Sequence, residues 1–173
     1  MHGQCYRKGN GQPYTRKEYI KGKPQIKITK FQSGSADRLQ DYDYTVQLLI
    51  NEKMQITHMA IESTRLAANK TLEKTTGESG YFSKLRIYPH VLLRENKMIA
   101  AAGADRLQEG MRRAFGKAVS LAARVKRGQC IMEIQVKKEH LEAAKKALKS
   151  ACVKLPGTPT IRDIQITSSK VNL

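Results

Sequence analysis

The chain has 173 residues, enough for one domain with a real hydrophobic core, and its hydrophobic content is 40% without any Trp. Lys and Arg number 32 against 15 Asp and Glu, a formal net charge of +17 that indicates a polyanionic partner, usually nucleic acid. An anionic membrane is the competing polyanion, but no apolar run of about 20 residues and no signal-peptide core occur, so we expect neither membrane insertion nor secretion.

Residues 1–24 are predicted to form an irregular, extended basic arm. Six Gly and Pro residues interrupt any periodicity, and basic side chains interleave with Tyr6, Tyr14 and Tyr19. Basic groups neutralise phosphates and tyrosine rings stack on unpaired bases, so an arm that becomes ordered on RNA is favoured over a disordered tail. The candidate RNA-binding residues of the arm are Arg7, Lys8, Tyr14, Arg16, Lys17, Lys21 and Lys23.

Residues 25–173 are predicted to form a single α+β domain that begins with two strands and a helix. Alternating apolar positions predict a strand over residues 26–31, ended by Ser33-Gly34-Ser35, and a second strand over residues 44–50. A helix is predicted over residues 57–74, with Thr57 as cap and Gly77 as its stop. The predicted inward positions are Ile26 and Ile28, then Val46, Leu48 and Ile50, then Ile61, Thr64, Ala68 and Leu72. The positions interpreted as lying off the buried stripe are Glu62, Arg65, Asn69, Lys70 and Glu73.

Two more strands are predicted over residues 81–88 and 90–95, separated by Pro89. In the first of them, Ser83, Leu85 and Ile87 face one way, whereas Lys84, Arg86 and Tyr88 face the other. This basic and aromatic stripe is either an RNA contact or an ordinary solvated sheet face, and the pattern favours neither. His90 has no acid or nucleophile close to it in the sequence, which favours a structural role over catalysis.

A glycine-punctuated stretch from Gly103 to Lys117 lies in a long loop at about residues 100–118. Long internal loops are uncommon and often functional, and the basic chemistry of this one suits an approach to phosphates. The alternative is a short helix packed on the core, because one helical face would hold Leu107, Met111, Ala114 and Phe115. The candidate RNA-facing residues of the loop are Gly103, Asp105, Arg106, Gly110, Met111, Arg112, Arg113, Phe115, Gly116 and Lys117.

The positive charge is concentrated around the arm and the loop. Residues 1–40 carry a net +7 and residues 97–127 a net +6, whereas residues 41–96 are neutral and residues 128–173 carry +4. A solvated lysine-rich surface would spread its excess more evenly, so we infer that the arm and the loop face the polyanion. The neutral middle segment is expected to supply core.

The remaining segments predict two strands, a helix and a last strand. Residues 121–125 and 130–137 are predicted to pair around a turn at Arg127-Gly128, and residues 138–152 to form a helix. The expected inward side chains are Cys130, Met132, Ile134 and Val136 in the strand and Leu141, Ala144, Leu148 and Cys152 in the helix. A strand over residues 160–166 completes an α+β fold with a mainly antiparallel sheet and two helices.

No catalytic or cofactor site is predicted. Gly110 and Gly116 are spaced wrongly for a phosphate-binding P-loop, and Ala118 stands where Ser or Thr should bind magnesium. No local Ser-His-Asp, Cys-His or paired-carboxylate set occurs, although catalytic groups can be remote in sequence. The three cysteines lack a Cys-x-x-Cys pair and are expected to be free thiols, and His2 with Cys5 forms at most half a metal site.

The loop and several flanking motifs resemble one known family. The most specific motifs are Ala102-Gly103-Ala104-Asp105-Arg106-Leu107-Gln108, Gly110-Met111-Arg112, Ala114-Phe115-Gly116-Lys117 and Ala123-Arg124-Val125. The supporting motifs are Cys5-Tyr6-Arg7, Pro13-Tyr14, Ala67-Ala68-Asn69-Lys70 and Asn96-Lys97-Met98. Over nearly its whole length the chain resembles the large-subunit ribosomal protein family called L-sixteen in bacteria and L-ten-e in archaea and eukaryotes, with the length of archaeal members.

The resemblance implies a cytoplasmic, non-enzymatic protein buried in large-subunit rRNA near the peptidyl-transferase centre. Its loop would reach toward tRNA acceptor ends, neighbouring ribosomal proteins and assembly factors would be further partners, and any structural magnesium would belong to the RNA. Further candidate rRNA-binding residues are Lys84, Arg86, Arg124 and Arg127.

The chain departs from the family pattern at two points in the loop. Arg113 stands where a small glycine is expected, and Ala118-Val119-Ser120-Leu121 replaces a Pro-Gln-Gly-Thr pattern, so the course of the loop after Phe115 is left open. The alternative functions are a free-standing RNA-binding protein or RNA chaperone and a basic enzyme acting on RNA.

Overall fold

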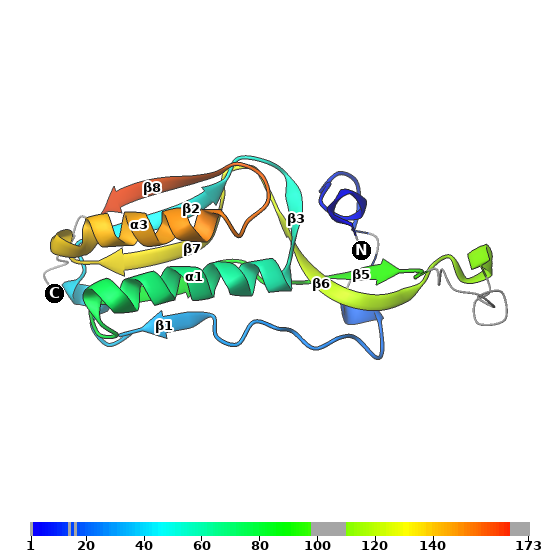
Figure 1. Ribbon diagram of the computed structural model, residues 1–173, viewed down its shortest axis with the longest axis horizontal. Coiled ribbons are helices and arrows are strands. Elements are labelled where there is room, and N and C mark those ends of the chain that lie inside the picture. The colour runs from blue at the N-terminus through cyan, green and yellow to red at the C-terminus, as the bar shows by residue number, and fades with distance from the viewer. Residues whose placement is uncertain (1, 14, 16, 98–109, 167–173) are drawn as a thin grey trace, which may run out of the picture.

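The computed structural model describes residues 2–13, 15, 17–97 and 110–166 and confirms the α+β class (Figure 1). The helices are α1 (His58–Thr76) and α3 (Leu141–Cys152). The strands are β1 (Gln32–Gly34), β2 (Tyr44–Ile50), β3 (Met54–Thr57), β4 (Tyr81–Leu85), β5 (Val91–Glu95), β6 (Lys117–Val125), β7 (Gln129–Val136) and β8 (Pro159–Gln165). No helix in this part of the chain is long and apolar enough to cross a membrane.

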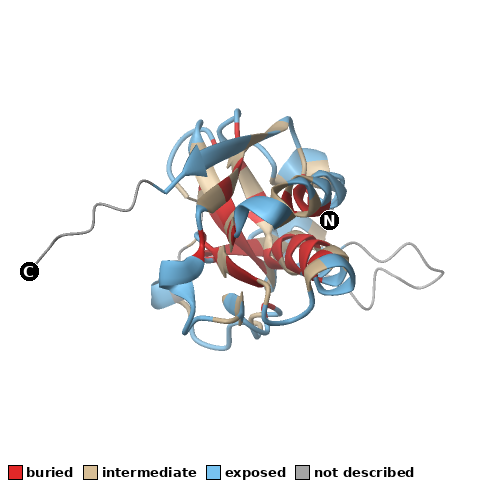
Figure 2. Cartoon of the chain, turned by 90° about the vertical axis from the view of Figure 1, so that its left-hand side faces the viewer, coloured by how far each residue is buried: buried red, intermediate tan, exposed pale blue. Residues whose placement is uncertain are grey.

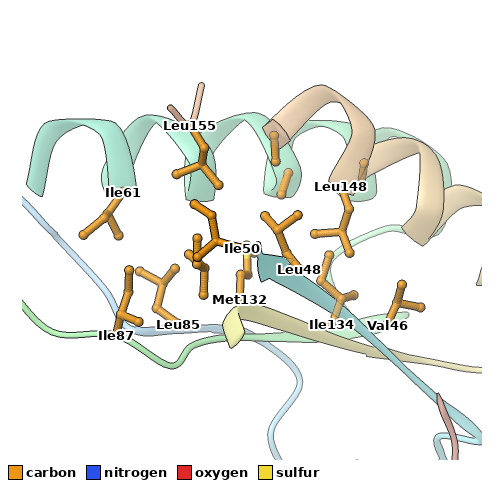
Figure 3. Packing of buried hydrophobic residues seen from close by; sticks show 14 of the residues in the cluster. Val46, Leu48, Ile50, Ile61, Leu85, Ile87, Met132, Ile134, Leu148 and Leu155 are labelled. Atoms are coloured by element: carbon orange, nitrogen blue, oxygen red, sulfur yellow. The ribbon is translucent and has the colours of Figure 1, made fainter. Parts of the chain in front are cut away.

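The larger of two sheets has five antiparallel strands in the order β1-β4-β7-β2-β8 and carries both helices on one face (Figures 1 and 2). The core lies between this face and the helices, and it is aliphatic as the composition predicts (Figure 3). Leu48, Met132 and Leu148 have no exposed surface. Each fully buried side chain of this kind contributes about 1.5–3 kcal/mol to folding.

Strand β2 and helix α1 confirm the sequence prediction closely. Val46, Leu48 and Ile50 alternate into the core, and the predicted helical stripe from Ile61 to Leu72 is buried. The Thr57 hydroxyl accepts a hydrogen bond from the Ala60 amide at 3.4 Å, and Gly77 ends the helix with a φ of 71°. Both ends of the helix are therefore fixed by the residues that the sequence marks.

Two residues of α1 that were expected on its polar face are buried instead. Arg65 is 8% exposed and donates from Nε and Nη2 to both carboxylate oxygens of Glu62, at 3.0 and 2.7 Å. Asn69 is 5% exposed and accepts a hydrogen bond from Ser83 at 3.0 Å. Both side chains also contact the sheet, because Arg65 Nη1 donates to Ser33 Oγ of β1 at 3.4 Å and Ser83 lies on β4.

The first predicted strand is wrong in position. Residues 26–31 lie outside any strand, with Ile28 buried, whereas β1 includes Ser33 and Gly34, which were expected to end the strand. The position of the strand depends on its pairing partner, because β1 begins only at the pair Gln32 and Lys84, where the chain comes alongside β4. Strand β4 likewise stops at Leu85, short of the predicted residue 88, although Ile87 remains buried as expected.

The predicted pairing of residues 121–125 with residues 130–137 is also wrong. Strand β6 pairs with β3 and β5 in a second, three-stranded sheet, whereas β7 pairs with β2 and β4 in the larger one. Gly128, with a φ of 76°, turns the chain from one sheet into the other, and its amide donates to the Ile50 carbonyl at 2.7 Å. Strand β3, which the sequence analysis missed, forms one edge of the smaller sheet.

The C-terminal prediction is largely confirmed. A short 3-10 turn over Lys138–His140 precedes α3, and β8 begins one residue before its predicted start. Ala144 and Leu148 are buried, while Leu141 and Cys152 pack against the core from partly buried positions. The three cysteines are free thiols.

The N-terminal arm lies against the smaller sheet rather than apart from the domain. The Arg7 carbonyl accepts from the Gln55 amide of β3 at 2.8 Å, and Lys8 forms an isolated bridge with Met54. Further along, the Leu92 amide of β5 donates to the Thr15 carbonyl at 3.1 Å, and the Thr15 hydroxyl donates to the Leu92 carbonyl at 3.0 Å. The arm therefore satisfies backbone groups on both edges of a three-stranded sheet that has β6 in its centre.

Candidate nucleic-acid interface

The described part of the candidate loop, residues 110–116, lies next to the paired strands β5 and β6, at the end of the molecule far from the helices (Figure 1). Glu95 and Lys117 form the last strand pair, so β6 begins inside the stretch that the sequence analysis assigned to the loop. The loop thus ends at Gly116, not at about residue 118, because its last residues pair with β5.

The end of β5 clamps the returning side of the loop. Arg94 Nε donates to the Phe115 carbonyl at 3.1 Å, Nη2 donates to the Gly116 carbonyl, and the guanidinium carbon lies 3.9 Å from the centre of the Phe115 ring. Asn96 Nδ2 donates to the Gly110 carbonyl at 3.1 Å. We call Arg94 and Asn96 the loop clamp, because together they hold residues on two turns of the loop against one strand end.

Gly116 is required where the loop meets the clamp. Its φ is 68°, and a Cβ added there would lie 2.4 Å from the Glu95 carbonyl carbon and 2.5 Å from the Asn96 nitrogen. No side chain fits at such a distance, and non-glycine residues also avoid this backbone conformation. The glycine therefore permits the close approach that puts the Gly116 carbonyl within reach of Arg94.

The described part of the loop presents apolar and cationic side chains to solvent. Residues Gly110–Arg113 form a 3-10 turn, in which Met111 is 75% exposed, and Phe115 is 50% exposed. This exposure contradicts the alternative of a helix whose Met111 and Phe115 pack on the core. Arg112 and Lys117 are also exposed. The loop therefore presents positive charge together with an aromatic ring and a thioether, the groups that would suit contact with RNA.

A cationic cleft of about 560 Å³ lies between the arm and β6. Lys53, Arg124 and Lys126 line it together with one carboxylate, Glu18, and residues 11–13 form its arm-side wall. His90 also lies at this cleft, and its backbone amide donates to the Ala122 carbonyl at 3.1 Å, in keeping with a structural position. Three cations against one anion make the cleft suitable for a phosphate group.

Arg124 has a second role that the sequence did not indicate. Its Nη2 donates to the carbonyls of Gly9 and Gly11, each at 2.6 Å, and so ties the arm across β6. Gly9 is itself buried against Met54, whose backbone nitrogen would lie 3.0 Å from an added Cβ. The Arg124 guanidinium thus positions the arm segment that forms one wall of the cleft, and it also contributes positive charge to the cleft.

The basic stripe of Lys84, Arg86 and Tyr88, which begins on β4 and continues beyond its end, is partly neutralised. Arg86 Nη1 lies 3.5 Å from Glu133 Oε1, and Lys84 stands directly opposite Glu133 in the strand register. Tyr88 stacks on Phe31 with ring centres 5.7 Å apart. The cations of the stripe lie next to the Glu133 carboxylate, and one face of the Tyr88 ring is covered by Phe31. These groups are therefore less available to RNA, and the stripe is a weaker candidate than the loop and the cleft.

The remaining candidate residues divide by what the structure describes. Exposed basic residues of the arm and of the turn between β6 and β7 are Arg7, Lys8, Lys21, Lys23 and Arg127. Residues outside the described chain are Tyr14, Arg16, Gly103, Asp105 and Arg106. Lys17 and Arg113 lie in 3-10 turns, and their side chains are outside the described set.

Sequence reasoning missed the loop clamp and two of the three cations in the cleft. Arg94 has no role in the sequence-based prediction, Asn96 has only a place in a family motif, and neither Lys53 nor Lys126 is singled out there. The topology offered one signal for the clamp. If the two strands that flank a loop pair as a hairpin, the last side chains of the first strand must lie next to the first residues of the second strand. The cleft had no local signal, because the arm and β6 are more than 100 residues apart.

Comparisons with known proteins agree on one family. Residues 9–162 match the family described as ribosomal protein L16p/L10e. A relative named large ribosomal subunit protein uL16 from Staphylothermus marinus is 55% identical over 153 residues, 88% of this chain and 87% of the relative. Proteins with the same name from Hyperthermus butylicus and Saccharolobus solfataricus are 52% and 55% identical, over 94% and 89% of this chain and 92% and 86% of the relatives.

Proposed function

The chain belongs to the ribosomal protein L16p/L10e family, and we propose that, as a structural constituent of the large ribosomal subunit, it binds large-subunit rRNA near the peptidyl-transferase centre and helps to position tRNA. The family consists of structural ribosomal proteins rather than enzymes. The protein accordingly acts in the cytoplasm, within the ribosome.

The loop clamp is the observation that carries the proposal. It fixes the backbone on both sides of Met111 and Arg112, so that an exposed thioether and an exposed cation project from the far end of a two-stranded stem. A rigid stem with a basic tip suits a deep approach to folded RNA, because phosphates position such a tip and bases contact its apolar groups. The family resemblance of the loop supports its direction toward the tRNA acceptor arm.

The arm and the cleft supply the second part of the interface. Exposed Arg7 and Lys8 lie on the arm, and Lys53 and Lys126 line the cleft beneath it. These groups would hold the domain on rRNA phosphates while the loop reaches inward. Neighbouring ribosomal proteins and assembly factors are further partners in this proposal, no cofactor is required, and structural magnesium belongs to the RNA.

Co-sedimentation tests the proposal against a free-standing RNA-binding protein or RNA chaperone. The tagged full-length chain should follow the large subunit through a sucrose gradient at near-equal stoichiometry and stay with it after a low-salt wash. A predominantly free cytoplasmic pool would contradict the ribosomal role.

A loop variant then tests the finer placement. Replacing the exposed Arg112 and Lys117 with Ala should leave the free energy of unfolding within about 0.5 kcal/mol, as for exposed sites, but impair subunit maturation or tRNA placement. Replacing the exposed Lys146 and Lys149 of α3 removes the same charge far from the loop and serves as the matched control. Equal defects in the two variants would mean that total charge, not the loop, matters.

A further inference from the structure

The end of the molecule opposite the loop carries the opposite charge. Strand ends, turns and helix ends meet there over residues 35–43, 73–80, 137–142 and 163–166, and this end faces the viewer in Figure 2. These segments, which we call the acidic end, contain eight acidic and four basic side chains, a net −4 that leaves +21 for the rest of a chain whose total is +17. RNA phosphates are repelled by such a surface.

A groove of about 630 Å³ opens at the acidic end between α1 and β1. Arg65, Asn69 and Glu73 line it from α1, where their spacing of four residues puts them on one face of the helix. Glu62 neutralises Arg65 through two hydrogen bonds, and the groove also contains Lys30, Glu73 and Glu78. The groove therefore has a small excess of negative charge.

Asn69 contributes a side-chain amide to the α1 wall of this groove. The residue is 5% exposed, and its Oδ1 accepts from the Ser83 hydroxyl at 3.0 Å. Because Asn69 lines the groove, its side-chain amide can donate to an acceptor there such as a carbonyl oxygen.

Tyr81 donates a hydrogen bond to one of the carboxylates in the groove. Its hydroxyl donates to Glu73 Oε1 at 3.3 Å, and burial together with the nearby Glu73 and Glu78 carboxylates raises the pKa of Tyr81 to about 12. The hydroxyl hence stays protonated at physiological pH. Glu73 and Glu78 are exposed and retain oxygens for a cationic side chain.

The wall of the groove opposite α1 is a free sheet edge. Strand β1 is the outermost strand, and its Phe31 carbonyl and Ser35 amide bond to β4, at 2.8 and 3.0 Å. Because backbone groups alternate in direction along a strand, the N–H and C=O groups of Gln32 and Gly34 point away from β4. An extended peptide pairs with such groups by adding a strand to the sheet.

We propose that this groove binds an extended, basic peptide segment of another protein. Its backbone pairs with Gln32 and Gly34, one of its carbonyls accepts from Asn69 Nδ2, and its Lys or Arg side chains pair with Glu73 and Glu78. An RNA base is disfavoured because Tyr81, the only aromatic residue lining the groove among the described residues, is 1% exposed and offers no ring for stacking. The inference rests on the proposed ribosomal function, since it assigns this groove to a neighbouring protein of the subunit.

Photo-crosslinking in the assembled subunit tests the proposal directly. Large subunits containing the full-length chain with a diazirine side chain at Ser79, an exposed residue of the groove, should yield adducts with a Lys- or Arg-rich segment of a second protein. The same probe at Met111 should yield RNA adducts. Adducts of the Ser79 probe with rRNA alone, or the lack of any protein adduct, would overturn the peptide proposal without affecting the proposed function.

A binding measurement on the purified full-length chain does not depend on ribosome assembly. A labelled eight-residue peptide of alternating Arg and Val should bind about three- to tenfold more weakly to the double variant Glu73→Gln and Glu78→Gln, as expected from the loss of two exposed ion pairs. The control variant Glu139→Gln and Glu142→Gln removes two exposed carboxylates of the acidic end outside the groove. Equal weakening in both variants would show that the peptide binds by general attraction, and the groove assignment would fail.

Discussion

Replacing Arg124 with Ala should detach part of the arm and weaken the whole domain. The guanidinium makes two charge-assisted hydrogen bonds at 2.6 Å, to the carbonyls of Gly9 and Gly11, one part-buried and one exposed. Hydrogen bonds from charged groups contribute about 1.5–3 kcal/mol each, and solvent reduces the exposed one. We therefore expect a loss of roughly 2–3 kcal/mol in the free energy of unfolding.

The change should be local in structure, because the arm has other attachments. The Arg7 carbonyl and Thr15 remain bonded to β3 and β5. Hydrogen exchange should accordingly rise at residues 9–12 while the arm stays in contact on either side of them. The Arg124→Lys variant keeps the charge but loses the guanidinium fork, and we expect it to lie between the wild type and Ala.

The matched control is Arg127→Ala, which removes the same charge from an exposed turn a few residues away. This control should change the free energy of unfolding by less than about 0.5 kcal/mol. Both variants lose one cation, so any additional loss of affinity for an rRNA fragment in Arg124→Ala reports the position of the arm. Equal unfolding midpoints in urea for the two variants, with unchanged hydrogen exchange at residues 9–12, would show that Arg124 does not hold the arm on β6.

Three further outcomes follow from the same contacts. Arg94→Lys should raise hydrogen exchange at residues 110–117 by about tenfold, the equivalent of about 1.4 kcal/mol, while leaving net charge unchanged; unaltered exchange would rule out the loop clamp. If six or more cations meet phosphates, affinity for a cognate rRNA fragment should fall about a thousandfold between 50 and 200 mM salt, and a flat response would point to an apolar partner surface. The hydrogen bond from Arg65 holds the pKa of Glu62 below its ordinary value, so Glu62 stabilises the fold above its unfolded pKa and this contribution is lost as pH falls through the lowered one. Acid denaturation below about pH 4 should therefore be shallower in Glu62→Gln, and identical curves would show that the pair contributes nothing.

Elements with local signals were predictable from the sequence. Helix α1 carries its cap, its stop and its apolar stripe within 21 residues, and β2 shows its burial in strict alternation. In both cases the sequence separation of the decisive residues is small, so the periodicity of one segment is sufficient. The loop was also found, because three glycines and clustered cations are visible without a partner strand.

Features that depend on distant segments were not predictable in the same way. Residues 26–31 alternate like a strand, but a strand requires a neighbour, and the pairing of this segment with β4 begins only at Gln32. Strands β6 and β7 are adjacent in sequence and both apolar, which favours a hairpin, yet Gly128 sends them into different sheets. The cleft could not be predicted for the same reason, because Arg124 holds the arm that forms one of its walls, and the two are more than 100 residues apart in sequence.

The placement of charge explains why a neutral middle segment is compatible with so basic a chain. Residues 41–96 contribute core and the acidic wall of the groove. Several cations lie on or near the smaller sheet and its loop instead, namely Lys53, Arg94, Arg112, Lys117, Arg124 and Lys126. Arg94 directs its donors to carbonyls, so the clamp itself needs no phosphate, and the exposed Arg112 and Lys117 remain available for RNA. The electric field of folded rRNA would therefore orient the molecule loop first and turn the acidic end toward protein or solvent. A single domain can in this way contact RNA at one end and a basic polypeptide at the other, because its two sheets keep the opposite charges apart.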